Sequence, residues 1–109
     1  MSGRSDQRTE PRFICGAPAR GQGARGAVRG TCENISVGGM FVLGPVLPMH
    51  ATMEWTVDLP APFGPVKATG EVRFVRAASG VGIRFTRLTP NDIATIQRFV
   101  ATAAPAPTL

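Results

Sequence analysis

The pattern that most restricts the fold is a strict alternation of apolar and polar residues over residues 52–59, TMEWTVDL. Met53, Trp55, Val57 and Leu59 take every second position, with Thr or acidic residues between them. Because successive side chains of a strand point to opposite faces, this spacing predicts a β-strand with one face on a core.

Other segments also have the character of short strands. Residues 66–76 and 81–86 alternate in the same way, and Phe74 falls on the same predicted face as Val72. Residues 40–43 form a short apolar run bounded by glycines. Short turns between successive strands predict antiparallel pairing. Since closing such a sheet removes its exposed edges, we expect a small barrel or a sandwich.

The first third of the chain is harder to interpret. Residues 13–15 could begin a strand, and residues 27–35 could form another that ends at Asn34. Gly, Ala, Pro and Arg dominate residues 16–26. The whole chain has 13 glycines and 10 prolines without a collagen-like repeat, which indicates many turns and few long helices. The predicted class is all-β.

One helix is predicted, over residues 90–101. Thr89 can cap it, Pro90 suits its first position, and Asp92 lies near the positive end of the helix dipole. Apolar residues including Ile96 follow at helical spacing, so one face is expected to pack against the barrel.

The chain ends, the hydropathy and the cysteines indicate which segments are ordered and where in the cell the protein is expected. We expect residues 1–7 to be a flexible tail and residues 102–109 to be disordered. No run of about 18 apolar residues is present, so we expect no membrane insertion. The polar N-terminus does not resemble a secretory signal, so we expect a cytoplasmic protein in which Cys15 and Cys32 stay reduced and structural.

The net charge of +5 is concentrated near the N-terminus. Residues 1–30 contain six arginines against two acidic residues, and eleven of the twelve cations in the chain are arginine. The planar guanidinium group can contact phosphate or guanine with two parallel hydrogen bonds. A solubilising basic tail would give the same excess, but an anionic ligand is the more specific interpretation.

The sequence gives little support for catalysis. Most acidic residues lie on exposed-looking strand positions, and His50 is a lone histidine in a turn-like context. Neither a Walker loop nor a dinucleotide fingerprint is present. Two cysteines seventeen positions apart do not make a zinc site without further ligands. We therefore predict a binding protein that is not an enzyme and holds no metal or cofactor.

The first of two motifs is the R-x-x-x-R spacing of Arg8 and Arg12. Pro11 disfavours helix at the preceding residue and keeps this segment extended or turned. The two guanidinium groups can then splay around a ligand.

The second motif is N-x-S-x-x-G, in which Asn34 and Ser36 precede Gly38 and Gly39. Short polar side chains can satisfy the backbone of a turn or contact the edge of a ligand. The two glycines allow either a positive φ or a close backbone approach. If the second motif stood alone, an ordinary tight connection between strands would be the better explanation.

Together, in this order and about twenty residues apart, the two motifs resemble those of the PilZ domain family. The similarity continues through GGMFV, VDLP, GEVRFV and GVGIRF to a helix after a Leu-Thr-Pro-x-Asp turn. It covers residues 8 to about 100. The resemblance implies a six-stranded antiparallel β-barrel with one C-terminal α-helix: a motif arm at 8–12, the barrel at 13–88 and the helix at 90–101.

Many PilZ domains bind the bacterial second messenger cyclic di-GMP. The resemblance implies that Arg8 and Arg12 grip the phosphates and the O6/N7 edge of guanine, while Asn34 and Ser36 contact the other guanine edge. The glycines of the second motif, Gly38 and Gly39, would leave room for the ligand. The arm would order over the ligand and change the surface that a protein effector contacts.

Two alternatives remain open. A PilZ domain can act without nucleotide, as a scaffold for motility, secretion or signalling proteins, although such members commonly lack the arginine motif. A basic barrel could also bind RNA or DNA, which would require exposed stacking aromatics. The chain has no tyrosine, and Trp55 lies on an apolar face with most phenylalanines. We therefore do not expect a nucleic-acid partner.

Overall fold

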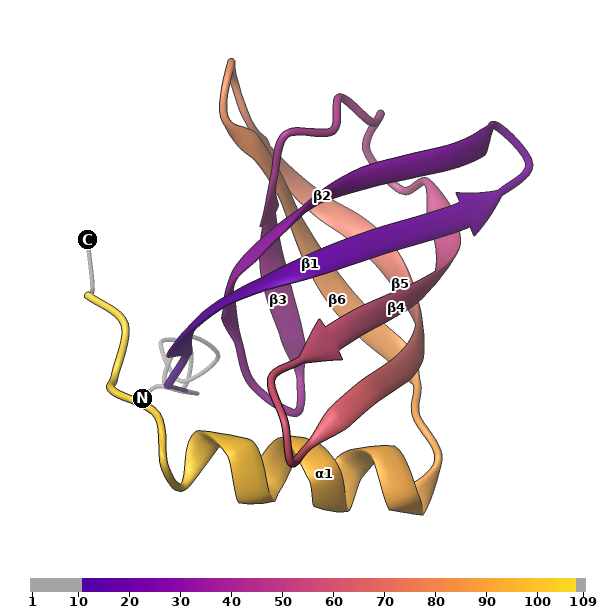
Figure 1. Ribbon diagram of the computed structural model, residues 1–109. Coiled ribbons are helices and arrows are strands. Elements are labelled where there is room, and N and C mark those ends of the chain that lie inside the picture. Colours follow the sequence, from indigo (N-terminus) through magenta and orange to yellow (C-terminus); the bar gives the residue numbers. More distant parts are fainter. Residues whose placement is uncertain (1–10, 108–109) are drawn as a thin grey trace, which may run out of the picture.

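The computed structural model describes residues 11–107 as six strands followed by one helix (Figure 1). The elements are β1 (Phe13–Gly23), β2 (Gly26–Ile35), β3 (Gly39–Leu43), β4 (Thr52–Leu59), β5 (Gly64–Arg76), β6 (Gly80–Arg87) and α1 (Pro90–Val100). All strand pairs are antiparallel, in the order β1-β2-β3-β6-β5-β4, and β4 pairs with β1 to close the barrel. The predicted fold class is confirmed, and the barrel replaces the sandwich alternative.

The core follows the alternation of β4. Met53, Trp55, Val57 and Leu59 all point into the barrel and are at most 4% exposed. Burying side chains of this size stabilises the folded chain by roughly 1.5–3 kcal/mol each. Trp55 is the largest fully buried side chain, and its ring lies against Gly21 of β1.

That contact explains why the β1–β2 hairpin was hard to identify from sequence. The residues of β1 that face the barrel interior are small, including Ala17, Ala19 and Gly21. The Trp55 ring fills the space that larger residues of β1 would take. The segment 16–26 therefore lacks the apolar alternation of an ordinary strand, although it contains most of β1 and the turn into β2.

The order of the strands differs from a simple series of hairpins. β3 pairs with β2 and β6, whereas β4 pairs with β1 and β5. The segment 44–51 therefore crosses one end of the barrel, where Leu47 is buried in the core. Turn residues alone could not predict this crossing.

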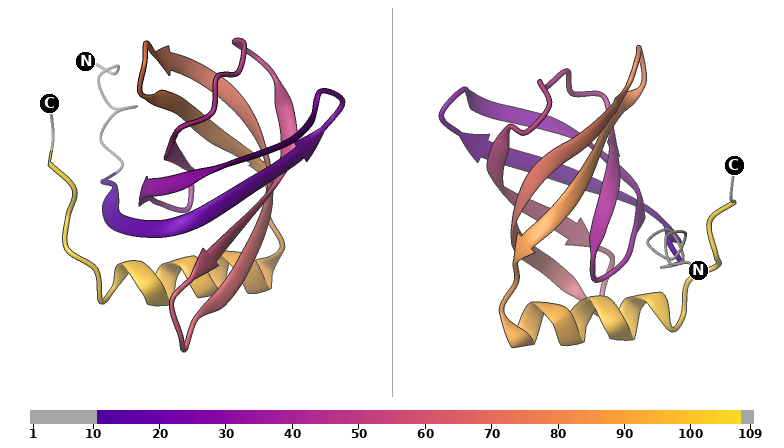
Figure 2. Two further views of the ribbon diagram at one scale, coloured as in Figure 1. Left: turned by 45° about the horizontal axis from the view of Figure 1, so that its top comes forward. Right: turned by 180° about the vertical axis from the view of Figure 1, so that it is seen from behind.

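Helix α1 covers the opposite end of the barrel (Figure 2). The Thr89 hydroxyl accepts a hydrogen bond from the backbone N–H of Asp92 at 3.1 Å, which is the predicted cap. Ile96 is fully buried, and the ring of Phe99 meets that of Phe63 edge-on with centroids 5.4 Å apart. Across residues 11–107, no helix has the length and apolar character needed to cross a membrane.

The C-terminal segment differs from the expected disordered tail. Pro105 forms an isolated bridge with Phe13, the Ala106 N–H donates to the carbonyl of Arg12 at 2.9 Å, and the Ile14 N–H donates to the carbonyl of Ala104 at 2.8 Å. β4 pairs with β1 only over Ala19–Gln22, so the start of β1 would otherwise leave backbone groups unpaired along this edge. The tail supplies those partners, which sequence periodicity could not reveal.

We expect Ile96→Ala to lower the free energy of unfolding by about 2–5 kcal/mol, because it leaves a cavity between α1 and the barrel. Urea denaturation followed by circular dichroism measures the change. Val46→Ala is the matched control, because Val46 is 91% exposed and its truncation should change stability by less than about 0.5 kcal/mol. Equal midpoints for the two variants would contradict the described packing of α1.

Candidate ligand-binding site

The two sequence motifs meet where β1 begins and β2 ends. Phe13 pairs with Ile35 and Ile14 pairs with Asn34, so Arg12 lies beside the end of β2. Nη1 of Arg12 donates a hydrogen bond to Oδ1 of Asn34 at 3.1 Å, in partly buried surroundings. Arg8, the other arginine of the motif, and the expected flexible tail at 1–7 lie outside the described residues.

Ser36 holds the turn between β2 and β3. Its hydroxyl accepts a hydrogen bond from the Gly38 N–H at 3.1 Å, and its own N–H donates to the carbonyl of Gly39 at 2.8 Å. The residue is 4% exposed. Ser36 therefore shapes the loop beside Asn34, and both of these hydrogen bonds are those of a turn residue.

Gly39 is required by a close backbone approach. A Cβ atom at this position would collide with the carbonyl oxygen of Ile83 on β6, and the residue is not in the left-handed region. Of the two explanations that the sequence allowed, close approach is correct for Gly39. The carbonyl of Gly38 accepts a hydrogen bond from the Phe85 N–H at 2.9 Å, so the turn is tied to β6 at two points.

A row of outward-facing residues runs from Asn34 across the neighbouring strands. Asn34 pairs with Phe41, Phe41 with Gly82, and Gly82 with Phe74. The rings of Phe41 and Phe74 stack with their centroids 5.8 Å apart, and the Phe74 ring lies over Gly82. Phe41 is almost fully buried, whereas Phe74 is 45% exposed. An aromatic surface thus lies near the polar motif.

Phe74 corrects the prediction from sequence, which placed it on the core face with Val72. The register between β5 and β6 shifts between Val72 and Phe74, so the alternation breaks there and Phe74 points outward. The sequence signal that could have indicated this is Gly82. Because glycine has no side chain, it leaves room for an aromatic ring from the neighbouring strand to lie over it.

A hollow of about 670 Å³ lies between Arg12 and this aromatic surface, and we call it the Arg12 pocket. Its lining residues are Arg12, Gly38, Arg73, Phe74, Gly82, Ile83, Arg84 and Phe85. Three of the described residues that line it are arginines and none is acidic. Arg73 and Arg84, which the sequence reasoning did not select, thus join Arg12 and Gly38 at a positively charged surface.

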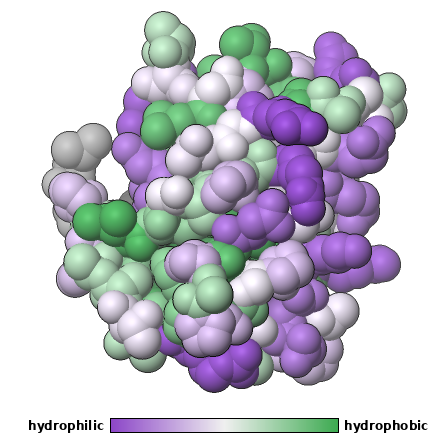
Figure 3. Space-filling view, viewed as in Figure 1, coloured by the Kyte–Doolittle hydropathy of each residue, from purple (hydrophilic) through white to green (hydrophobic). Residues whose placement is uncertain are grey.

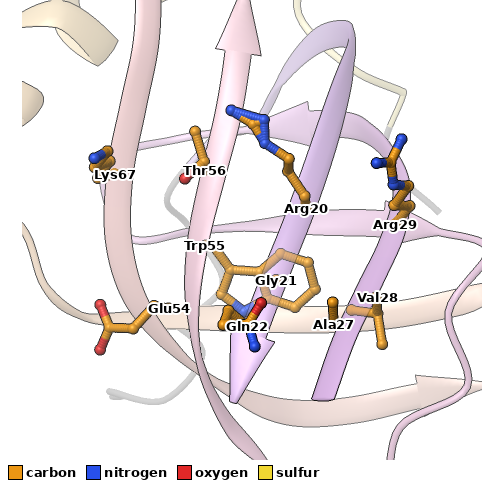
Figure 4. A pocket seen from close by; sticks show the side chains of 10 residues that line it. All are labelled: Arg20, Gly21, Gln22, Ala27, Val28, Arg29, Glu54, Trp55, Thr56 and Lys67. Carbon is orange, nitrogen blue, oxygen red and sulfur yellow. The ribbon is translucent and has the colours of Figure 1, made fainter.

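A second hollow of about 520 Å³ lies over the β1–β2 hairpin and the neighbouring β4 and β5, and we call it the hairpin hollow (Figure 4). Arg20 and Arg29 project beside each other there, with Trp55 below them. Arg20 forms an ion pair with Asp58 at 3.3 Å, and Glu54 also lines the hollow. Hydrophilic residues cover the right-hand part of this face in Figure 3. None of the motif residues within 11–107 lines it, so the Arg12 pocket is the stronger candidate.

The described part of the chain offers little for a metal ion. Among residues 11–107, no group of three or more His, Cys, Asp or Glu side chains is arranged to hold one. His50 instead contacts Glu71, with Nδ1 and Oε2 3.0 Å apart.

Several solved structures have the same fold as this chain. The PilZ domain of YcgR from Escherichia coli with c-di-GMP has a TM-score of 0.71 at 14% identity, covering 89% of this chain and 91% of that one. The Bacillus subtilis inhibitor of motility MotI/DgrA has a TM-score of 0.70 at 15% identity, and the apo form of MrkH from K. pneumonia has 0.71 at 18%. The matches to MotI/DgrA and to MrkH each cover 93% of this chain and 50% of the other chain, so this chain spans about half the length of those two proteins.

No curated protein sequence matches the chain. The sequence profile of the PilZ domain, however, matches residues 6–102, which include both motifs, all six strands and the helix. The chain belongs to the PilZ domain family.

Proposed function

We propose that this PilZ domain binds cyclic di-GMP in the Arg12 pocket and relays the signal to a protein partner. The single observation that carries the proposal is the hydrogen bond from Arg12 to Asn34. It brings one residue of each motif to the same place, beside a pocket lined by arginines and an exposed phenylalanine.

The chemistry of the pocket suits this ligand. Arginines can bind the phosphates and the O6/N7 edge of guanine with paired hydrogen bonds. The exposed face of Phe74 offers a surface on which a base can stack. A volume of about 670 Å³ is ordinary for a small-molecule site. The YcgR domain that shares this fold was solved with c-di-GMP, which supports the same ligand class here.

The contact between Arg12 and Asn34 suggests how binding begins. Oδ1 of Asn34 accepts a hydrogen bond from Arg12. Guanine N1–H and N2–H are donors of the same kind, so they can replace the guanidinium at that oxygen. Arg12 would then turn toward the phosphates or the other guanine edge. Arg8 is proposed to act with it, while Ser36, Gly38 and Gly39 keep the loop in shape.

The proposed output is a change of surface around the motif arm. The carbonyl of Arg12 also accepts a hydrogen bond from Ala106, so the arm contacts the C-terminal segment as well as β2. Movement of Arg12 toward a ligand would alter this junction, which a protein effector could recognise. We accordingly propose a regulatory binding role without catalysis, exercised in the cytoplasm.

The alternative is a scaffold that acts without nucleotide. The exposure of Phe74 and of Val75, which is 48% exposed, favours a protein-contact surface at this place. Calorimetric titration with cyclic di-GMP separates the two functions, because the scaffold predicts no heat of binding at high protein concentration.

We expect Arg12→Ala to weaken binding of cyclic di-GMP at least about tenfold, or roughly 1.4 kcal/mol, because it removes a charge-assisted contact. Isothermal titration calorimetry measures the affinity, and Arg8→Ala should give a loss of similar size. Arg29→Ala is the matched control, since it removes an exposed arginine from the hairpin hollow and leaves the Arg12 pocket intact. Unchanged affinity in both motif variants would overturn the site.

We expect Phe74→Ala to weaken binding by about 1–3 kcal/mol, the usual value of stacking one base on an aromatic ring. Phe74→Trp should retain the affinity because it preserves a stacking surface. Val75→Ala serves as the control, because it shortens an equally exposed neighbour outside the pocket lining. If Phe74→Ala and Val75→Ala bind equally well, the aromatic surface has no role in recognition.

A further inference from the structure

Cys15 and Cys32 lie on the core side of the β1–β2 hairpin, near the strand ends where Arg12 contacts Asn34. Cys32 is fully buried, while Cys15 is partly exposed and packs against the same core cluster. The register between β1 and β2 shifts between Ile14 and Ala17. In this bulge Cys15 and Gly16 together face one residue of β2, and Gly16 takes a φ of 71°.

The bulge brings the two thiols to the core side of neighbouring strands. The two side chains are close enough for each to affect the pKa of the other. A bulge of one extra residue leaves Cys15 on the core side of β1, as Ala17 is, and Ala17 is the pairing partner of Cys32. The sulfur atoms can therefore meet without separation of the two strands.

The two thiols have different acidities. The neighbouring Cys32 side chain lowers the pKa of Cys15, against the opposing effect of burial, and a backbone hydrogen bond at Ala17 adds to the lowering. The neighbouring Cys15 side chain and burial raise the pKa of Cys32. The more accessible cysteine is thus the one that loses its proton more readily, and the thiolate is the nucleophile in thiol oxidation.

We infer that Cys15 and Cys32 are a reversible oxidation site, at which hydrogen peroxide oxidises Cys15 and Cys32 then closes a disulfide. The Cys15 thiolate attacks one peroxide oxygen, so an S–O bond forms, the O–O bond breaks, and hydroxide leaves and takes up a proton as water. The sulfur of Cys32 then attacks the resulting sulfenic acid. The S–S bond forms, the S–O bond breaks, and hydroxide leaves with the Cys32 proton as a second water.

The pair also touches the ligand site. The Cys32 thiol donates to the backbone carbonyl of Asn34, with sulfur and oxygen 3.4 Å apart. The positive charge of Arg12 also acts on the Cys32 thiol. Formation of the disulfide would remove the thiol hydrogen of Cys32, so the hydrogen bond from Cys32 to the backbone carbonyl of Asn34 would be lost. A lower affinity for cyclic di-GMP in the oxidised state follows, and this consequence rests on the proposed function.

The test treats the reduced chain of residues 1–109 with hydrogen peroxide and blocks the remaining thiols with an alkylating reagent. Mass spectrometry should find both thiols lost and the tryptic peptides 13–20 and 30–67 joined by a bond that dithiothreitol breaks. Oxidation should reach half its maximal rate at a lower pH than in a free cysteine peptide, because the Cys15 pKa is lowered. Retention of both thiols, or disulfides only between different chains, would overturn the inference.

Single substitutions separate the proposed role of Cys15, which peroxide oxidises first, from that of Cys32, which then closes the disulfide. In Cys32→Ser, peroxide should leave Cys15 as a sulfenic acid that dimedone captures. In Cys15→Ser, the buried Cys32 should stay a thiol under the same treatment. Capture of dimedone at Cys32 instead would reverse the assignment. The measurements on the unaltered chain do not depend on whether these variants fold.

Calorimetric titration of the reduced and the oxidised chain with cyclic di-GMP tests the link to the ligand site. We expect affinity in the oxidised chain to be lower by roughly threefold or more. Equal affinities would overturn the link. If the reduced chain shows no binding, the proposed function has failed, while the mass spectrometry still decides whether the oxidation site exists.

Discussion

The structure depends on the pairing of β1 with β4, which closes the barrel. Ala19–Gln22 of β1 lie against Glu54–Val57 of β4, and this contact brings Trp55 onto Gly21. Closure pairs backbone groups that open sheet edges would leave exposed, and it buries the Trp55 ring against β1. It also holds β1 in the barrel. The pairing of β1 with β2, which continues to Phe13 and Ile35, then brings Arg12 beside the end of β2.

The candidate site lies where the regular sheet is interrupted. Register shifts occur at Ile14/Ala17, Cys32/Asn34 and Val72/Phe74. The first places Cys15 beside Cys32, the second is next to Asn34, and the third turns Phe74 outward over Gly82. Bulges bend strands and change the direction of side chains, which is why they are frequent beside binding sites. Here they gather one polar contact, one aromatic surface and one thiol pair at a single side of the barrel.

This arrangement gives one side of the barrel two linked roles in our proposals. The outer surface offers arginines and an aromatic ring to an anionic purine ligand, and the inner surface directly behind it carries the thiol pair. The hydrogen bond from Cys32 to the carbonyl of Asn34 connects the two surfaces. The C-terminal segment contacts the same region from the other edge of β1 through Ala104 and Ala106. A change at any of these contacts would therefore reach the residues of the proposed ligand site.

The sequence alone determined the features that depend on local pattern. The alternation of β4 and the Thr89 cap of α1 could be predicted, because each depends on residues close together in the chain. The family could be predicted because its motifs are matched by residue type and spacing alone. Tertiary structure decided the rest. The β1–β2 hairpin carries small residues because Trp55 fills the barrel, Phe74 points outward because of a register shift, and the tail pairs with β1 because that edge lacks a strand. Each of these outcomes depends on a partner distant in sequence, which no local periodicity can specify.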